Sequence, residues 1–207
     1  KRYETMGVYG VTADDIIITN GSQQVLTMIG ACMLDPGDKI IVENPTYLVA
    51  LQSFHFFDPE ILPVTINPDG IDCDELAATV QANPDVKFAY VIPNFQNPTG
   101  RVMSLEKRKG LYDLACRYDF IILEDNPYGD LRFAGTDVPS IKSLDTEHRV
   151  IYTGSFSKIL APGLRVGYVS APKEIISKIT VCKQVSDVHT NILSLIHISE
   201  PTRPISI

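Results

Sequence analysis

The chain has 207 residues, of which 44% are hydrophobic and 21% charged, with 13 glycines and 14 prolines. This composition is that of an ordinary globular protein and excludes disordered, collagen-like and fibrous classes. The formal net charge of −7, with no cluster of lysine and arginine, argues against nucleic-acid binding through this segment. The length suits one sizeable α/β domain.

The cysteines and the apolar runs indicate where the protein works. The four cysteines are far apart and form no C-x-x-C pair, which favours reduced thiols in a cytoplasmic protein. No apolar run approaches the ~20 residues needed to cross a bilayer, so we expect no membrane partner. The chain starts at Lys1, without an initiator methionine and in what reads as mid-helix. We therefore expect a fragment of a longer protein.

Short β-branched runs alternate with longer amphipathic stretches along the chain. In chain order, the pattern predicts a strand over 15–19, a helix over 22–34, a strand over 39–43, a helix over 46–57, a strand over 61–66, a helix over 72–83, a strand over 87–92, a helix over 104–118, strands over 120–124, 150–153 and 165–170, and a helix over 173–187. Ser104 is the expected N-cap of its helix. We find no internal repeat.

This alternation predicts an α/β fold with a mainly parallel, seven-stranded type of sheet that is covered by helices on both faces. Ligands of such sheets bind at the carboxyl ends of the strands. A polar, glycine- or proline-marked segment follows each of several strands, and we expect these segments at one edge of the sheet: 20–23, 44–47, 93–100, 125–128 and 154–158.

The last stretch differs in kind. Residues 193–203 break the amphipathic pattern and look like the translation of a transposase sequencing adapter read in frame. We expect residues 193–207 to be a non-native tail, and the alternative is a natural loop. Comparison with the underlying nucleotide read would distinguish the two.

Gly21, Ser22 and Gln23 lie where a strand is expected to turn into a helix. Free backbone N–H groups and the positive end of the helix dipole at such a turn bind phosphate. Ser22 is equally suited to be an ordinary N-cap, and that interpretation is favoured for the motif alone.

Two further segments carry groups that a cofactor ring would need. Asn97 begins an Asn-Pro-Thr-Gly turn, from which its amide could donate to a ring oxygen. Asp125 ends a buried strand, where a carboxylate needs a cation such as a protonated pyridine nitrogen. Tyr128 could bond the ring's phenolate oxygen. For each residue separately, a turn, a helix cap or simple packing is an adequate explanation.

The segment from Gly154 to Tyr168 is the most informative. A lysine in an apolar setting has a neutral amine available to form a Schiff base with an aldehyde, and Lys158 is placed for that role. Ser155 and Ser157 lie on the same loop, and Arg165 offers a planar fork that suits phosphate. A lone lysine is more often a solvated surface residue, so this assignment depends on the other segments.

Together, the motifs resemble a known family. The ordered series Gly21-Ser-Gln, Asn-Pro-Thr-Tyr47, Asn97-Pro-Thr-Gly, Asp125-Asn-Pro-Tyr128 and Ser155-x-Ser-Lys158 with Arg165 looks like the fold-type I, class I/II aminotransferases, which depend on pyridoxal phosphate. It is most similar to the branch of 2-aminoadipate and kynurenine aminotransferases. The resemblance covers residues 1–192 and implies a partial large domain, incomplete at both ends.

The resemblance implies a role for each matching residue. Lys158 would form the Schiff base and move the substrate's Cα proton, and Asp125 would pair with the pyridine nitrogen. Asn97 and Tyr128 would hold the ring's oxygen, and Tyr47 would stack on the ring. No metal is implied. The phosphate would lie in a cup formed by Gly21, Ser22, Gln23, Ser155, Ser157 and Arg165.

The resemblance also implies parts that this chain lacks. Family members have an N-terminal segment that reaches the neighbouring subunit and a C-terminal small domain with the arginine that binds the substrate carboxylate. We therefore expect a homodimer for the whole protein and no complete active site in this chain alone. The substrates would be an amino acid and a 2-oxo acid.

Two alternatives remain open. The same motifs occur in winged-helix transcriptional regulators whose aminotransferase-like domain senses pyridoxal phosphate, and a basic winged helix upstream would favour that class. A lyase or a cyclopropane-forming synthase on the same fold would also share the cofactor site, because the cofactor carbanion has several exits.

Overall fold

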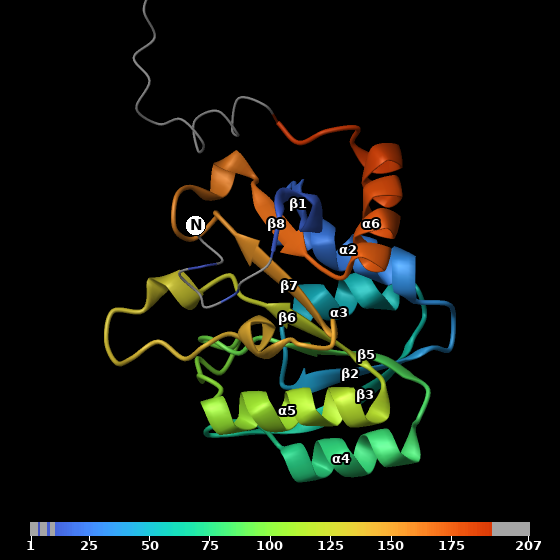
Figure 1. The fold of residues 1–207 in the computed structure, drawn as a ribbon, viewed down its shortest axis with the longest axis vertical. Coiled ribbons are helices and arrows are strands. Elements are labelled where there is room, and N and C mark those ends of the chain that lie inside the picture. The colour runs from blue at the N-terminus through green and yellow to red at the C-terminus, as the bar shows by residue number, and fades with distance from the viewer. Residues whose placement is uncertain (1–3, 5–7, 9–10, 192–207) are drawn as a thin grey trace, which may run out of the picture.

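The computed structural model describes residues 4, 8 and 11–191. The described part is built on an eight-stranded sheet with the order β1-β8-β7-β6-β5-β2-β3-β4 (Figure 1). The strands are β1 (Ile16–Thr19), β2 (Lys39–Asn44), β3 (Glu60–Asn67), β4 (Gly70–Ile71), β5 (Val86–Val91), β6 (Ile121–Asp125), β7 (Val150–Ser155) and β8 (Gly167–Ser170). The α-helices are α2 (Ser22–Met33), α3 (Leu48–His55), α4 (Cys73–Ala82), α5 (Leu105–Tyr118) and α6 (Lys173–Ser186).

The sheet is mainly parallel, as the sequence predicts. Strands β3, β2, β5, β6 and β7 run parallel to one another. β8 is antiparallel to both of its neighbours, β7 and β1. The eighth strand, β4, is a two-residue segment antiparallel to β3, and it is too short to show an alternating pattern in the sequence. The seven longer strands are the ones that the sequence predicts.

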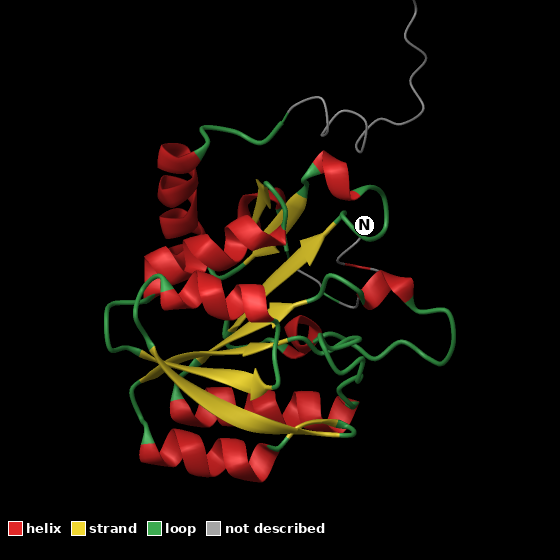
Figure 2. Cartoon of the chain, turned by 180° about the vertical axis from the view of Figure 1, so that it is seen from behind, coloured by secondary structure: helices red, strands yellow, loops and turns green. Residues whose placement is uncertain are grey.

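Helices cover both faces of the sheet. Helices α2, α3 and α6 pack on one face, and α4 and α5 pack on the other (Figures 1 and 2). Successive residues of β2 serve the two layers in turn: Ile40 and Val42 belong to the first hydrophobic cluster, and Ile41 belongs to the second. Side chains alternate along a strand, so a strand covered on both faces is apolar at most of its positions. The sequence shows this as continuous apolar runs.

All element boundaries agree with the predictions to within two residues, and three of the differences have a clear structural reason. Ser104 is the N-cap of α5, and its side chain accepts from the Lys107 N–H at 3.2 Å, which confirms that prediction. Helix α3 is shorter than the predicted 46–57, because Tyr47 has extended backbone. Asp15 ends a short 3-10 helix and does not start β1. Arg165 is not part of β8, because it adopts a left-handed conformation (φ 52°) after the 3-10 helix Pro162–Leu164.

Other sequence-based expectations concern the surface and the ends of the chain. Within the described residues, no helix is long and apolar enough to cross a membrane. All four cysteines have free thiols. The tail predicted for residues 193–207 lies outside the described residues.

Candidate active site

A cavity of about 190 Å³ lies at the carboxyl ends of the parallel strands. It brings together every side chain that the sequence singles out, since its walls come from the segments that follow β1, β2, β5, β6 and β7. Gly21 is the one predicted residue that does not line it. The lining residues are Ser22, Gln23, Tyr47, Ile92, Asn97, Asp125, Pro127, Tyr128, Ser155, Ser157, Lys158, Pro162 and Arg165.

The start of α2 forms one wall of the cavity. Gly21 is the N-cap, with φ +76°, and Ser22 is the first helical residue, so the interpretation of Ser22 as the N-cap is wrong. Among the described residues, no side chain caps this helix. The Gln23 amide instead reaches α3, where it donates to the Ser53 hydroxyl. The first N–H groups of α2 therefore remain available to an anion.

Arg165 lies directly against this helix start. A Cβ atom added at Gly21 would be 2.5 Å from Nη2 of Arg165, so only glycine permits this approach. Nη1 of Arg165 donates to the Ser157 hydroxyl at 3.3 Å, and the Ser155 hydroxyl accepts from the Ser157 N–H at 3.1 Å. A guanidinium, two hydroxyls and a helix N-terminus thus converge from two segments that are far apart in the sequence. This combination suits a phosphate group.

Asp125 is the buried charge of the site. Asp125 is 3% exposed, and its Oδ2 accepts a hydrogen bond from the Tyr90 hydroxyl at 2.9 Å. Oδ1 is buried without a hydrogen-bond partner among the described residues. Burial raises the pKa of the Asp125 carboxyl to about 7, and the hydrogen bond from Tyr90 opposes that rise. A buried carboxyl with one unpaired oxygen needs a cationic or protonated partner to ionise.

Lys158 and two tyrosines surround the same space. Nζ of Lys158 is 5.9 Å from the centroid of the Tyr128 ring. Burial raises the pKa of the Tyr47 hydroxyl, and the proximity of Tyr128 and then of Asp125 adds to this rise. Lys158 is exposed, so the apolar setting expected around its amine is not found within the described residues. Asn97 is half-buried and also lines the cavity.

The sequence did not point to several residues that build the cavity. Ile92, Pro127 and Pro162 line it, and Tyr90 lies beneath it as the partner of Asp125. Gln96 holds two loops together, because its Nε2 donates to the Pro45 carbonyl at 2.8 Å and its Oε1 accepts from Thr99. Their sequence context explains the omission: Tyr90 and Ile92 read as strand residues, and Gln96 reads as part of a turn.

The fold and the cavity are those of an α/β protein with a polar ligand site at the carboxyl ends of parallel strands. Residues 2–206 match the family model of aminotransferase class I and II. The chain belongs to this family. The predicted resemblance is thereby confirmed, and the relatives include the 2-aminoadipate and kynurenine branch.

Several relatives indicate the range within the family. The chain is 48% identical to aromatic-amino-acid aminotransferase 1 of Thermococcus litoralis, over 87% of this chain and 44% of that protein. It is 32% identical to an uncharacterized HTH-type transcriptional regulator of Bacillus subtilis, over 89% of this chain and 38% of that protein. The chain spans about half the length, or less, of the curated relatives that it matches.

Solved structures give the same picture. The kynurenine aminotransferase of Pyrococcus horikoshii, solved in complex with PMP, has a TM-score of 0.87 and 45% identity, and the match covers 91% of this chain and 48% of that chain. The α-aminoadipate aminotransferase of Thermus thermophilus, complexed with N-(5'-phosphopyridoxyl)-L-leucine, has a TM-score of 0.88 and 36% identity, over 95% of this chain and 50% of that chain.

Proposed function

We propose that residues 1–192 form the pyridoxal-phosphate-binding domain of an aminotransferase, which transfers an amino group between an amino acid and a 2-oxo acid. The observation that carries the proposal is the single cavity that contains a lysine amine, a buried carboxyl and an uncapped helix start together. Membership of the aminotransferase class I and II family supports it.

The residues present fit this cofactor at both of its charged ends. The phosphate would lie at the start of α2, where Arg165 packs against Gly21 and bonds Ser157. At the other end, Asp125 has an unpaired buried oxygen among the described residues. A protonated pyridine nitrogen would supply the cation that this oxygen needs. An anion site and a cation site in one small cavity match a phosphorylated pyridine.

Bound pyridoxal phosphate would supply an aldehyde that captures amines and a ring that accepts electrons released at the substrate's Cα. Lys158 would hold the aldehyde through Nζ, and the same Nζ, once released, would carry the proton to and from the substrate. Asp125 would keep the ring nitrogen protonated. Asn97 and Tyr128 would hold the ring oxygen, and Tyr47 would cover the ring face.

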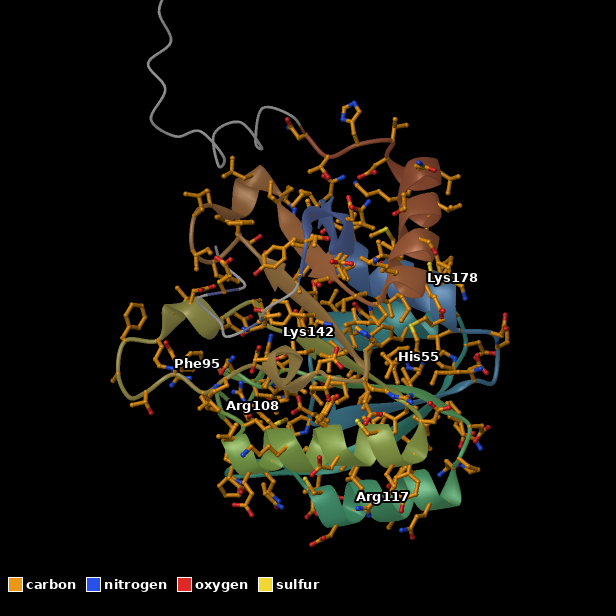
Figure 3. The ribbon with its side chains drawn as sticks, viewed as in Figure 1. His55, Phe95, Arg108, Arg117, Lys142 and Lys178 are labelled. Atoms are coloured by element: carbon orange, nitrogen blue, oxygen red, sulfur yellow. The ribbon has the colours of Figure 1, made fainter. Side chains whose placement is uncertain are left out.

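The direct test uses the protein expressed from its complete gene. The wild type with pyridoxal phosphate is expected to show the absorbance band of a lysine-bound cofactor, and amino acids that it accepts are expected to shift that band. Lys158→Ala should abolish the band. Lys178→Ala, which removes an exposed lysine of α6 (Figure 3), should leave it unchanged. A band that survives Lys158→Ala would contradict the assignment.

The regulator remains the second candidate, because two relatives are described as uncharacterized HTH-type transcriptional regulators. Both candidates would hold the cofactor through Lys158, so the absorbance band does not separate them. Amino-group exchange with 2-oxoglutarate does, since an aminotransferase forms glutamate and a sensor does not. A lyase would release the group that it eliminates from the amino acid without transferring the amino group to 2-oxoglutarate, so it would form no glutamate.

Assembly and location complete the proposal. We propose a homodimer in the cytoplasm. Leu48, the first residue of α3, is 64% exposed, and Phe56, the C-cap of the same helix, is 83% exposed. Such apolar side chains favour a protein contact. The free thiols support a reducing compartment. Light scattering on the full-length protein would test the dimer, and a monomeric mass would contradict it.

A further inference from the structure

We propose that Tyr90 is a positioning residue that sets the orientation and the charge of the Asp125 carboxylate. This inference rests on the proposed cofactor function. Tyr90 does not line the cavity. It lies on β5, the strand that pairs directly with β6, on which Asp125 lies. Its hydroxyl donates to Oδ2 of Asp125 at 2.9 Å, which leaves Oδ1 as the oxygen without a partner among the described residues.

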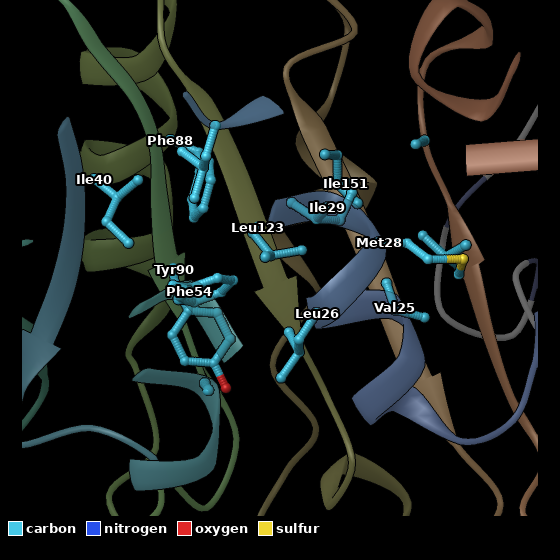
Figure 4. Close-up of a cluster of buried hydrophobic side chains, with 14 of the residues drawn as sticks. Val25, Leu26, Met28, Ile29, Ile40, Phe54, Phe88, Tyr90, Leu123 and Ile151 are labelled. Atoms are coloured by element: carbon cyan, nitrogen blue, oxygen red, sulfur yellow. The ribbon is translucent and has the colours of Figure 1, made fainter. Parts of the chain in front are cut away.

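The ring of Tyr90 is packed as an ordinary core residue. It is fully buried in the cluster beneath α2 and α3, where it lies beside Phe54 with ring centroids 5.5 Å apart (Figure 4). Phe88, two residues earlier on the same face of β5, makes the same edge-on contact with Phe54 at 5.3 Å. A phenylalanine therefore satisfies the packing at this face. The hydroxyl of Tyr90 needs a different explanation.

A buried hydroxyl costs free energy unless it has a partner. Asp125 is that partner, and the geometry assigns the two oxygens different tasks. Oδ2 is fixed by a donor from the core, and Oδ1 is left to a cation at the cavity. Because a carboxylate that accepts a hydrogen bond is favoured in its ionised form, Tyr90 opposes the effect of burial on Asp125.

The surroundings of Tyr90 keep its hydroxyl protonated, so it remains a hydrogen-bond donor. Burial, followed by the proximity of Asp125 and of Glu43, raises the pKa of its hydroxyl, so the phenol stays protonated in the physiological range. Glu43 is itself engaged, since its Oε2 accepts from the Ile92 N–H at 3.0 Å. The other titratable groups that face this region are those of the cavity wall: Tyr47, Tyr128, Lys158 and Arg165.

The test compares two ligands that differ at one ring atom. Pyridoxal phosphate has the ring nitrogen, and its 1-deaza analogue has a C–H group in that place. In the full-length protein, the wild type is expected to bind pyridoxal phosphate more tightly than the analogue. Tyr90→Phe should lower this ratio of affinities about tenfold, the size expected when a hydrogen bond to a charged group is lost. A purely structural role would weaken both ligands equally and leave the ratio unchanged.

Two controls sharpen the result. Tyr112→Phe removes another largely buried hydroxyl, which accepts from Thr146 N–H at 2.8 Å and packs in the opposite hydrophobic cluster, and it should not alter the ratio. In the background of Asp125→Asn, Tyr90→Phe should have no further effect, because the two residues act as one unit. An effect of full size in that background would overturn the proposal.

A second variant covers a failure of Tyr90→Phe to fold. A fluorinated tyrosine at position 90 keeps the hydroxyl and makes it a stronger donor, so the affinity ratio should rise. An unchanged ratio would overturn the proposal for Tyr90. A wild-type protein that binds no pyridoxal phosphate would instead contradict the proposed function, and the two failures are thus distinguishable.

Discussion

Glu124 and Asp125 are consecutive residues of β6, and both are buried, but they face opposite helical layers. Both oxygens of Glu124 accept backbone N–H groups of the 3-10 helix Ile141–Leu144, from Ile141 at 3.1 Å and from Lys142 at 2.8 Å. Asp125 has one hydrogen bond, and its second oxygen has no partner among the described residues.

The two carboxyls also differ in the charges around them. Burial raises the pKa of Glu124, and the guanidinium of Arg108 gives the largest opposing effect. Arg108 is fully buried in α5 on the side of the sheet (Figure 3). For Asp125, the only opposing effect is the hydrogen bond from Tyr90, and no cation of the described residues contributes to the shift of its pKa. The fold itself supplies hydrogen-bond donors for both oxygens of Glu124, whereas one oxygen of Asp125 has no partner among the described residues. We therefore expect Glu124 to contribute to the stability of the fold and Asp125 to contribute to ligand binding.

The largest effect on the unfolding free energy is expected from substitution of Glu124. Glu124→Ala removes the acceptor of two backbone N–H groups and the counter-charge of Arg108. Each buried N–H group left without an acceptor costs about 1–3 kcal/mol, and urea denaturation would measure the loss. The exposed Glu60 is the matched control, and Glu60→Ala should change the unfolding free energy by less than about 0.5 kcal/mol. Equal losses for both variants would contradict the contrast.

Asp125→Asn should behave in the opposite way. Without cofactor, the variant is expected to keep or gain unfolding free energy at pH 8, because it removes a buried, half-paired charge. Its affinity for pyridoxal phosphate should fall roughly 10–100-fold, since a hydrogen bond to a charged group contributes about 1.5–3 kcal/mol. Fluorescence titration checks the affinity. A large loss of stability with unchanged affinity would show that Asp125 is structural.

The cofactor-free protein should lose stability as the pH rises. The ordinary pKa of the Asp125 carboxyl is 3.8, and burial raises it to about 7, so the folded state holds an additional proton between these values. This contribution is complete below pH 3.8 and is lost as the pH rises through about 7, with a slope near 1 kcal/mol per pH unit. Asp125→Asn should remove that slope.

Glu43 also contributes to the pH dependence of the unfolding free energy. Burial raises the pKa of its carboxyl from 4.5 to about 8, so it adds a slope of the same sign that persists in Asp125→Asn. Pyridoxal phosphate should flatten the Asp125 part in the wild type, because a bound cation favours the ionised carboxyl. Identical slopes with and without Asp125 would contradict the assignment.

The smallest effect is expected from a comparison of two glycines, Gly21 at the start of α2 and Gly37 in the turn before β2. Gly21 and Gly37 both have positive φ, +76° and +86°, but a Cβ atom would strike Arg165 only at Gly21, and it would meet nothing within 4 Å at Gly37. Substitution by alanine should cost each about 1 kcal/mol of strain. Only Gly21→Ala should also weaken binding of inorganic phosphate and of pyridoxal phosphate, by a few-fold on the order of one hydrogen bond. Calorimetry would separate the two variants.

The sequence predicts the fold better than it predicts the contacts of the site. Continuous apolar runs identify the covered strands, and the segments after them identify the cavity walls. Position along a strand does not show which neighbour lies across it, so the pairing of Tyr90 with Asp125 was not predictable. The left-handed backbone of Arg165 also escaped prediction, because arginine rarely adopts it and no local pattern marks it.

The exposure of Lys158 was likewise not predictable. Its assignment in the sequence came from the serine-rich loop and from the resemblance to the family, and neither reports how many side chains surround an amine. The helix cap shows a similar limit: Ser22 is a good N-cap by residue type, but Gly21 takes that position, with the positive φ of +76° that favours glycine.

The pairing of β1 with β8 has a consequence for how this chain folds. Ile16 pairs with Ser170, and a Cβ atom at Gly167 would be 2.6 Å from the Ser22 nitrogen, so the early helix start is completed by a late strand. Contacts between such distant segments form slowly, because the intervening chain must first be brought together. During synthesis on the ribosome, the parallel strands can assemble before β8 appears. The ligand cavity should therefore be among the last features to form.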